Sequence, residues 1–553
     1  WVKNLKERFG VDYSGWTGYS WNSELFPDYR QFLRELKERN LHITLNLHPA
    51  DGVHSYEDMY EQMAKAVGID PASKQTVEFK CGNDDHWNAY FDVLHKPYER
   101  EGVDFWWIDW QQQGGTTDRR MDPLLVLNHT RYLHALRTGR TPLILSRYGG
   151  PGSHRYPVGF SGDTFATWAS LAFQPEFTAT AANAAYPWWS HDIGGHMHGS
   201  HDPELTLRWI QFGVFSPIMR LHSSDNRFMH KEPWMFEDGF GKTMSEFLRV
   251  RHRLIPYLYT ENLRCSETRS MMLRPLYFEE PENQMLYHAF RHQYYFGSAF
   301  LVAPVTSPLD PVTRCAPVDV YLPEGGWTDY FTHWRYEGGR SLRVYRPLDR
   351  IPVFVPDGTI LPMNQDDIVN NSVENPEAIL FRIYPGKPAT YTLMEDNGLA
   401  PSDEGYRRAQ TRVFFDGSDL VIDEPKGDRS ILPEKRHACV EIIGVEYEEP
   451  CSSDGMMHMR YDTERHVLAM EFASGRTDPI RVHWKNPLKR IRANRVRLMT
   501  ELLDRAYMSL DLKMTLQRMM EARTDDMALL AELARMDLPG KLFEAMLEIL
   551  TTV

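Results

Sequence analysis

Two aspartates end apolar segments of the chain, where a carboxylate group is unexpected. Asp109 follows a Trp-Trp-Ile run, and Asp163 follows a Phe-Ser-Gly run. Burial of a carboxylate beside indole rings costs free energy unless the group is paired or functional. Two carboxylates at one site, one kept protonated and one kept ionised by its surroundings, are the minimum equipment for glycoside hydrolysis. Acidic residues in such positions also bind metals or cap helices, and the two residues alone leave these alternatives open.

The segments that carry these aspartates belong to an alternation of short apolar runs and amphipathic helices between residues 25 and 290. Continuous apolar runs between helices are typical of buried parallel strands. Six such runs occur, at residues 43–48, 103–110, 143–147, 158–163, 188–195 and 271–276. Each run carries a polar residue toward its carboxyl end: His48, Asp109, Arg147, Asp163, Asp192 and Arg274.

The position of these polar residues favours one fold. The carboxyl ends of the strands of a (β/α)8 barrel converge at one mouth, where the active site is built. A doubly wound sheet would be expected to carry a Gly-rich phosphate loop, and the sequence has none. Six strands are two fewer than a barrel has, and the chain begins at Trp1 within sequence of folded character. The sequence therefore predicts an α/β fold with a (β/α)8 TIM-type barrel whose first strands are missing.

The character of the sequence changes twice after the predicted barrel. Short β-rich segments separated by Gly and Pro turns follow residue 296, and a helical periodicity rich in Met and Leu begins at residue 486. We therefore predict four domains: a catalytic barrel at residues 1–296, a proximal β-sandwich domain at 297–368, a distal β-domain at 369–486 and a helical C-terminal tail at 487–553.

The composition argues against several classes of protein. The 553 residues include 62 basic and 76 acidic side chains, a net charge of −14, which argues against nucleic acid as a partner. No run of 18 apolar residues occurs, so we expect no membrane partner. The five cysteines are scattered and lack CxxC spacing, which indicates free, mostly buried thiols in a reducing compartment. We therefore expect a cytoplasmic location, and the oligomeric state stays open.

Tryptophan is concentrated in the first part of the chain, where twelve of the fifteen precede residue 240. Flat aromatic rings stack on the apolar faces of pyranose sugars, which makes Trp110 and Trp189 candidates for the walls of a sugar pocket. Packing against barrel helices explains each of these tryptophans about equally well.

Histidines cluster near the predicted strand that contains Asp192. Zinc sites use histidines at short spacing, and His191, His196, His198 and His201 lie within eleven residues. No matching Cys or Glu pattern accompanies them, and the Gly-Gly pair inside the run indicates a tight turn near a substrate. We therefore predict neither a metal nor a cofactor.

The block from residue 15 to residue 227 resembles the catalytic barrel of glycoside hydrolase family 31, the family of many α-glucosidases and α-xylosidases. Four segments carry the resemblance: Trp107-Ile108-Asp109-Trp110, Gly162-Asp163-Thr164, Ser190-His191-Asp192-Ile193-Gly194-Gly195-His196 and Met219-Arg220-Leu221-His222-Ser223. A weaker resemblance continues through residue 365.

The resemblance implies roles for five residues. Asp109 matches the nucleophile of the family, and Asp163 matches its acid/base. Arg147, Asp192 and His222 match ligands of the sugar in the cleaved subsite. An enzyme of this kind cleaves with retention, through a covalent glycosyl-enzyme, and needs no cofactor.

The sequence departs from the family directly after the nucleophile. The family commonly has Met-Asn-Glu there, whereas Trp110, Gln111 and Gln112 follow Asp109. This change alters one wall of the sugar pocket. Gln111 is a candidate contact to a neutral polar substituent, because an amide group both donates and accepts hydrogen bonds.

We therefore predict a retaining, exo-acting α-glycoside hydrolase, α-glucosidase-like, that acts on an oligosaccharide or another glycoside. An α-N-acetylgalactosaminidase or another non-glucose α-glycosidase of the same family, and a transglycosylase, are the alternatives among enzymes. The alternative of another class is an inactive carbohydrate-binding relative, against which the intact pair of Asp109 and Asp163 argues.

Overall fold

The computed structural model describes residues 17–81, 83–109, 122–147, 151–156, 158–366, 374–399, 401, 403–475, 479–522 and 525–553. The described chain forms two compact units. Unit 1 runs to Gly162 and also includes Asn183–Ser190, and unit 2 consists of Asp163–Ala182 and His191–Val553. The candidate site residues are therefore divided between the two units.

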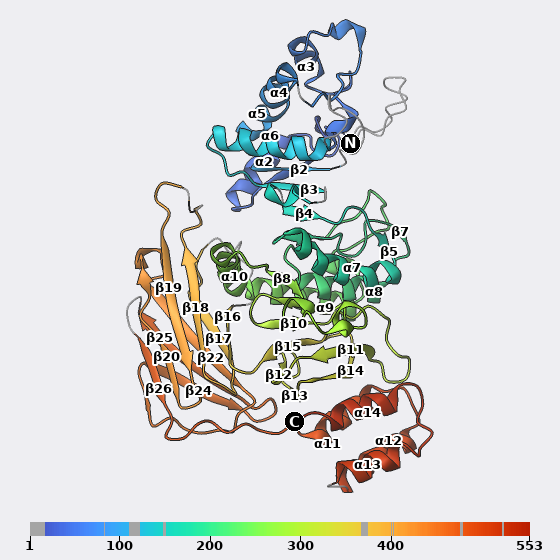
Figure 1. The fold of residues 1–553 in the computed structure, drawn as a ribbon, viewed down its shortest axis with the longest axis vertical. Helices are drawn as coiled ribbons and strands as arrows, with labels where there is room; N and C mark the ends of the chain where they lie inside the picture. Colours follow the sequence, from blue (N-terminus) through green and yellow to red (C-terminus); the bar gives the residue numbers. More distant parts are fainter. Residues whose placement is uncertain are drawn as a thin grey trace. The chain divides into compact units, whose positions relative to one another are not determined.

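Unit 1 is built on a five-stranded sheet, which lies in the blue-to-cyan part of Figure 1 with its helices. Its strands are β1 (Thr44–Leu47), β2 (Phe105–Ile108), β3 (Ile144–Arg147), β4 (Val158–Phe160) and β6 (Trp189–Ser190). The strands pair in the order β1-β2-β3-β4-β6, and every neighbouring pair is parallel. Five of the six predicted strands are thereby confirmed as members of one parallel sheet.

Helices connect these strands. They are α2 (Tyr29–Glu38), α3 (Tyr60–Ala66), α4 (Asp84–Ala89), α5 (Lys96–Arg100) and α6 (Pro123–Arg137). The side chains of Asp28 and Asp122 cap α2 and α6 by accepting hydrogen bonds from backbone N–H groups of the first turn. On β2, Trp106 is buried in the hydrophobic core of the unit, whereas Trp107 contacts Phe160 with ring centroids 5.6 Å apart. Successive residues of a strand point to opposite faces, so β2 packs on both sides.

Unit 2 begins with a two-stranded parallel pair and four helices. They are β5 (Phe165–Ala166), β7 (Met197–Gly199), α7 (Trp168–Thr180), α8 (Pro203–Val214), α9 (Asp238–Arg253) and α10 (Ile255–Thr268). Every residue of α8 from Leu205 to Val214 is buried. A helix that is buried on all sides belongs to the interior of its unit, and α8 is such a helix.

The sixth predicted barrel strand has a different partner from the one expected. The segment around Arg274 forms β8 (Leu273–Pro275), which pairs antiparallel with β9 (Tyr294–Phe296). The prediction of a parallel barrel strand at residues 271–276 is therefore wrong. A short apolar run predicts burial but not the direction of its neighbour, because the neighbour comes from another part of the chain.

β8 is an edge strand of a six-stranded sheet with the order β13-β12-β15-β10-β9-β8. Its other strands are β10 (Phe300–Val302), β12 (Gly326–Asp329), β13 (Arg335–Glu337) and β15 (Val353–Pro356). A separate antiparallel pair joins β11 (Ala316–Leu322) to β14 (Arg340–Arg346).

Two further sheets follow. The first has the order β16-β17-β22-β25-β24, formed by β16 (Thr359–Asn364), β17 (Ala378–Tyr384), β22 (Lys435–Ile443), β24 (Met456–Asp462) and β25 (Val467–Gly475). The second has the order β18-β19-β20-β26-β23, formed by β18 (Ala389–Asp396), β19 (Arg408–Phe415), β20 (Asp419–Ile422), β23 (Ser452–Ser453) and β26 (Ile480–His483), with β21 (Lys426–Gly427) also on β19. Buried and exposed residues alternate along β19, as expected where one face of a sheet covers a core. The predicted domain boundaries at residues 296, 368 and 486 stay predictions.

Helices form the last part of unit 2, as the periodicity after residue 486 predicts. They are α11 (Arg495–Arg505), α12 (Leu510–Ala522), α13 (Asp526–Leu533) and α14 (Leu542–Leu550). Their Leu and Met side chains form a core that also contains Cys315 and Tyr345. A buried ion-pair network ties α14 to the sheets, because Arg346 donates to both Asp329 and Glu548, at 2.9 and 2.6 Å.

Two sequence expectations concern the whole chain. All five cysteines are free, and Cys81, Cys265 and Cys315 are buried, which confirms the prediction of free, mostly buried thiols. Within the described ranges, no helix combines the length and the apolar character that crossing a membrane requires.

Candidate active site

In unit 1, Asp109 and Arg147 meet at the carboxyl edge of the parallel sheet. Arg147 is the last residue of β3, and Asp109 directly follows the neighbouring strand β2. The Nε atom of Arg147 donates to Oδ1 of Asp109 at 2.6 Å, and the two side chains are only 8% and 9% exposed. On the other side, Nε2 of His48 lies 3.8 Å from Oδ2 of Asp109. Three of the predicted strand-end residues thus lie together, since adjacent parallel strands end side by side, and their roles stay predictions.

The position of Arg147 depends on its neighbours in the sheet. Its guanidinium group lies over the ring of Phe160, 5.4 Å from the ring centroid. A Cβ atom on Gly162 would lie 2.5 Å from Nη1 of Arg147, and Gly162 has a φ of +77°. Glycine is therefore required at position 162 for two reasons: its φ is positive, and a larger side chain would collide with Arg147.

This geometry orients the Asp109 carboxylate. One oxygen is held by a charge-assisted hydrogen bond, which is stronger and more directional than a neutral one. Because the guanidinium group supplies the counter-charge in a buried setting, the pair avoids the cost of an isolated buried carboxylate. A carboxylate that is fixed through one oxygen can present the other oxygen to an electrophilic carbon, which is the geometry that a nucleophile needs.

In unit 2, a second group of polar residues forms around Asp192. Residues 193 and 221 form a parallel β-bridge, which holds the segments of Asp192 and His222 side by side. Because bridge residues point away from their neighbours in sequence, Asp192, Arg220 and His222 share the opposite face. Nη2 of Arg220 donates to Oδ1 of Asp192 at 2.5 Å, and Asp192 is fully buried. Oδ2 of Asp192 has no hydrogen-bond partner among the described residues and can accept a further hydrogen bond.

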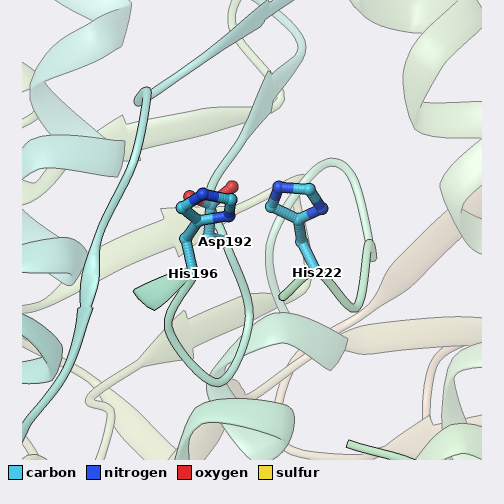
Figure 2. Close-up of side chains that lie close together, drawn as sticks. All are labelled: Asp192, His196 and His222. Atoms are coloured by element: carbon cyan, nitrogen blue, oxygen red, sulfur yellow. The ribbon is translucent and has the colours of Figure 1, made fainter. Parts of the chain in front are cut away.

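Two histidines complete this group. Figure 2 shows the imidazole rings of His196 and His222 side by side next to Asp192, and their centroids are 4.7 Å apart with an angle of 13° between the planes. Burial, together with the charge of Arg220, lowers the pKa of His222 to about 3. The ring is therefore neutral at neutral pH, with one N–H donor and one acceptor nitrogen. Burial also raises the pKa of Asp192, against the opposing effect of Arg220.

The turn after Asp192 needs both of its glycines. Gly194 and Gly195 have φ angles of +89° and +83°. A Cβ atom on Gly195 would lie 2.5 Å from Cα of Ala166, and one on Gly194 would lie 2.4 Å from Cδ of Lys231. The Gly-Gly pair thus lets the chain pass closely against β5 and against a buried lysine, as its predicted role in a tight turn requires.

Asp163 stands at the start of unit 2, and its side chain is exposed. The next residue, Thr164, accepts hydrogen bonds through its carbonyl oxygen from the N–H groups of His196 and Met197, at 2.8 and 3.1 Å. The negative charge of Asp163 contributes to the raised pKa of Asp192. The structure therefore brings Asp163 into the neighbourhood of Asp192, where solvent reaches its carboxyl group.

Of the remaining predicted site residues, the structure describes only Trp189. Trp189 is buried in β6 and contacts Tyr186 edge to face, with ring centroids 5.2 Å apart, so it packs within unit 1. Trp110 and Gln111 lie outside the described residues, as does Gln112.

Three residues act on Asp192 that the sequence does not single out for this role: Arg220, His196 and Lys231. Arg220 stands two positions before His222, and side chains two apart on an extended segment point the same way, so this spacing is a usable signal. The sequence indicates His196 as a possible metal ligand and as part of a family 31 motif, but not as a charge neighbour of Asp192. Lys231 is buried in a loop, where burial lowers its pKa to about 8, and no sequence pattern indicates its contact with the Gly-Gly turn.

Asp192, His196 and His222 also have the reach to hold a metal ion, because their ligand atoms lie within 4.8 Å of one another. Neutral imidazoles and a carboxylate are ligands that zinc accepts. Arg220 and Lys231, however, already bring positive charge to Asp192, and a divalent cation would be repelled by both. The arrangement fits hydrogen bonding to a polyhydroxylated ligand better than metal binding, and the absence of a metal stays a prediction.

Two family models match the chain. The model described as "Glycosyl hydrolases family 31 TIM-barrel domain" matches residues 8–261, and the model described as "Glycosyl hydrolase family 31 C-terminal domain" matches residues 269–361. The second match begins just before β8, in agreement with the antiparallel pairing of that strand.

Curated relatives agree with these matches. An alpha-xylosidase of Saccharolobus solfataricus is 26% identical over 504 residues, which cover 84% of this chain and 65% of the relative. Alpha-glucosidase 2 of Bacillus thermoamyloliquefaciens is 25% identical over 450 residues, 74% of this chain and 55% of the relative. Human neutral alpha-glucosidase C is 33% identical over 224 residues, 40% of this chain and 24% of the relative. The chain thus spans less than two thirds of the length of each of these proteins.

A solved structure shows the same fold. The GH31 dextranase of Flavobacterium johnsoniae, complexed with glucose, superposes with a TM-score of 0.70 at 20% identity and covers 85% of this chain and 66% of its own. The predicted fold class, a TIM-type barrel followed by β-rich domains, is confirmed by this match and by the two family models.

Proposed function

Because the chain belongs to glycoside hydrolase family 31, we propose that it is a retaining, exo-acting α-glycoside hydrolase in which Asp109 is the nucleophile and Asp163 the acid/base. One observation carries the proposal beyond family membership: Asp109 is buried at the carboxyl edge of the parallel sheet with one oxygen held by Arg147 at 2.6 Å. A carboxylate that served only the fold would not need to stand at the edge where barrel enzymes build their sites.

The first step of the proposed reaction is glycosylation of the enzyme. The carboxylate of Asp109 attacks the anomeric carbon of the terminal sugar, and the bond to the glycosidic oxygen breaks. Asp163 donates its proton to that oxygen, so the aglycone leaves as a neutral alcohol. The products of this step are the free alcohol, a glycosyl ester on Asp109 and an ionised Asp163.

The second step releases the sugar. Asp163, now a carboxylate, accepts a proton from a water molecule whose oxygen attacks the anomeric carbon. The ester bond to Asp109 breaks, and the sugar leaves with the configuration that it had in the substrate. Asp163 is protonated again for the next cycle. Where a sugar hydroxyl takes the place of water, the same intermediate gives transglycosylation.

The group around Asp192 supplies the sugar contacts in this proposal. Oδ2 of Asp192 accepts from a sugar hydroxyl, and Arg220 fixes the carboxylate through Oδ1. His222 is neutral and therefore offers a donor or an acceptor without adding charge. Contacts of this kind orient a polyhydroxylated ring without favouring a charged substrate.

The names of similar proteins suggest the sugar on which the enzyme acts. Relatives bear the names alpha-xylosidase and alpha-glucosidase, and a structural neighbour is a dextranase, so we propose a terminal α-linked glucose or xylose. N-acetylgalactosamine and other α-linked sugars remain the alternatives, since Gln111 and Gln112 replace two residues that commonly follow the nucleophile in the family.

We also retain the predicted cytoplasmic location as a proposal.

A panel of substrates and two variants test this proposal. The protein is assayed against nitrophenyl α-glucoside, α-xyloside, α-galactoside and N-acetyl-α-galactosaminide. We expect hydrolysis of one of the first two, a loss of several orders of magnitude in Asp109→Ala and Asp163→Ala, and partial rescue by azide, because a small anion replaces a deleted carboxylate. Full activity in either variant would refute the roles, and inactivity of the intact protein on every α-glycoside would favour a carbohydrate-binding relative.

A further inference from the structure

A cavity in unit 2, remote in sequence from the candidate active site, is lined by an unusual number of cations. It lies where the turn between β12 and β13, the ends of β22 and β25, and the start of α11 meet. Figure 1 shows α11 beginning beside the end of the chain, close to β13. The lining includes five arginines and a single acidic residue: Arg335, Arg465, Arg490, Arg492, Arg497 and Glu464. The whole protein has a net charge of −14, whereas the residues that line this cavity carry an excess of positive charge.

Nearby carboxylates neutralise only part of this charge. Asp357 accepts from Arg490 at 2.8 and 3.1 Å and from Arg335 at 3.0 Å. In contrast, no carboxylate of the described residues lies within 4 Å of Arg465 or Arg492, and both are exposed at the cavity. Among the described residues, these two guanidinium groups therefore have no carboxylate within ion-pair distance.

A histidine of the lining contacts one of these arginines. Nη2 of Arg465 lies 3.4 Å from Nε2 of His333, and because arginine only donates, Nε2 must be the acceptor. Burial lowers the pKa of His333, so the neutral ring adds no charge of its own to the cavity. Nδ1 of His333 and Nε of Arg335 are both buried and have no hydrogen-bond partner among the described residues. Both atoms are closed off from solvent, so the exposed guanidinium groups of Arg465 and Arg492 are the donors available to an anion.

The start of α11 adds further positive charge at the cavity. Asn494 caps the helix, its side chain accepting from the N–H of Arg497 at 3.1 Å, and both residues line the cavity. The N-terminal end of a helix carries a partial positive charge that attracts anions. Together with the arginines, this gives the cavity several N–H donors and positive charge.

We propose that this cavity binds an oxyanion of the phosphate class, either free phosphate or the phosphate group of a phosphorylated sugar. Its volume of about 50 Å³ is several times what one water molecule occupies and suits one tetrahedral group. Arginine matches phosphate oxygens with paired N–H donors. Because the lining comes from three separate parts of unit 2, the bound anion ties the helical tail to the β-sheets.

Calorimetric titration with inorganic phosphate, at constant ionic strength set by sodium chloride, tests the proposal. We expect one site in the intact protein and at least tenfold weaker binding in Arg465→Gln and in Arg492→Gln. Neither arginine has a carboxylate partner within the described chain, so neither substitution breaks an ion pair of the fold. Arg460→Gln, an exposed position on β24 outside the cavity, is the matched control and keeps the intact affinity.

Two further binding measurements identify the ligand and distinguish the cavity from the proposed active site. Glucose 6-phosphate binding tenfold tighter than phosphate identifies a phosphorylated sugar, and equal affinities identify free phosphate. The variant Asp109→Ala keeps phosphate binding, because the cavity contains no residue of the proposed active site. Absence of binding above the chloride background, or unchanged binding in both Arg465→Gln and Arg492→Gln, would overturn the proposal whatever the glycosidase activity.

Discussion

Replacing Arg147 by glutamine removes the counter-charge of Asp109 while keeping an N–H donor in reach. The two side chains are 2.6 Å apart at their closest atoms and less than 10% exposed. With charge centres roughly 4 Å apart and an effective dielectric constant of about 20, the attraction is about 4 kcal/mol. Removal of one partner from a buried pair costs about 3–5 kcal/mol, and a retained neutral hydrogen bond returns about 1 kcal/mol of this. We therefore expect a loss of about 3 kcal/mol.

This loss has a kinetic and a structural readout. If the pair serves to position the nucleophile, about 3 kcal/mol appears as a decrease of roughly 100-fold in kcat/KM on the nitrophenyl glycoside that the intact protein hydrolyses. We expect the decrease mainly in kcat, since Asp109 acts in the chemical step. Thermal unfolding of the same variant measures how much of the loss is structural.

A matched substitution controls for the removal of an arginine. Arg137 lies exposed in the last turn of α6, in the same unit, and Arg137→Gln should change the unfolding free energy by less than about 0.5 kcal/mol and leave kcat/KM unchanged. If Arg147→Gln keeps kcat/KM within threefold of the intact protein, the pair does not orient the nucleophile, and the reasoning from the buried contact fails.

Three other outcomes follow from the structure. Gly195→Ala should lower Tm and activity far more than Gly194→Ala, because its Cβ meets the Cα atom of Ala166 at 2.5 Å, whereas that of Gly194 meets only a movable lysine side chain; equal effects in activity and melting assays would contradict this. Lys231→Met should raise Tm at pH 7, since burial lowers the pKa of Lys231 to about 8 and the penalty for its charge is fully present below that pH. The gain should shrink as the pH rises from 8 toward the unfolded value near 10.5, and a gain independent of pH would show that the lysine charge is not responsible. Arg346→Met should cost about 3–5 kcal/mol of unfolding free energy by leaving Asp329 and Glu548 unpaired, as measured by denaturant titration; a loss below about 1 kcal/mol would mean that the tail is held by its apolar core alone.

The local part of the fold follows from the sequence, because its causes are local. The runs at residues 43–48 and 103–110 are apolar and flanked by amphipathic helices. This alternation of short apolar runs and helices is sufficient to identify β1 and β2 as parallel strands. The edge on which Asp109 and Arg147 stand follows as well, since parallel strands end at one edge. The resemblance to family 31 rests on short motifs whose order and residue types can be identified from the sequence.

Other features depend on contacts between distant residues, and only the tertiary structure decides them. The direction of the neighbour of β8 is set by β9, whose pairing no local pattern encodes. Arg220 and Lys231 reach Asp192 from loops, so their charges enter its environment only when the chain is folded. The unpaired Arg465 and Arg492 are likewise distant in sequence from β12 and β13. Sequence patterns indicate burial and periodicity, whereas the pairing of charges depends on which distant residues the folded chain brings together.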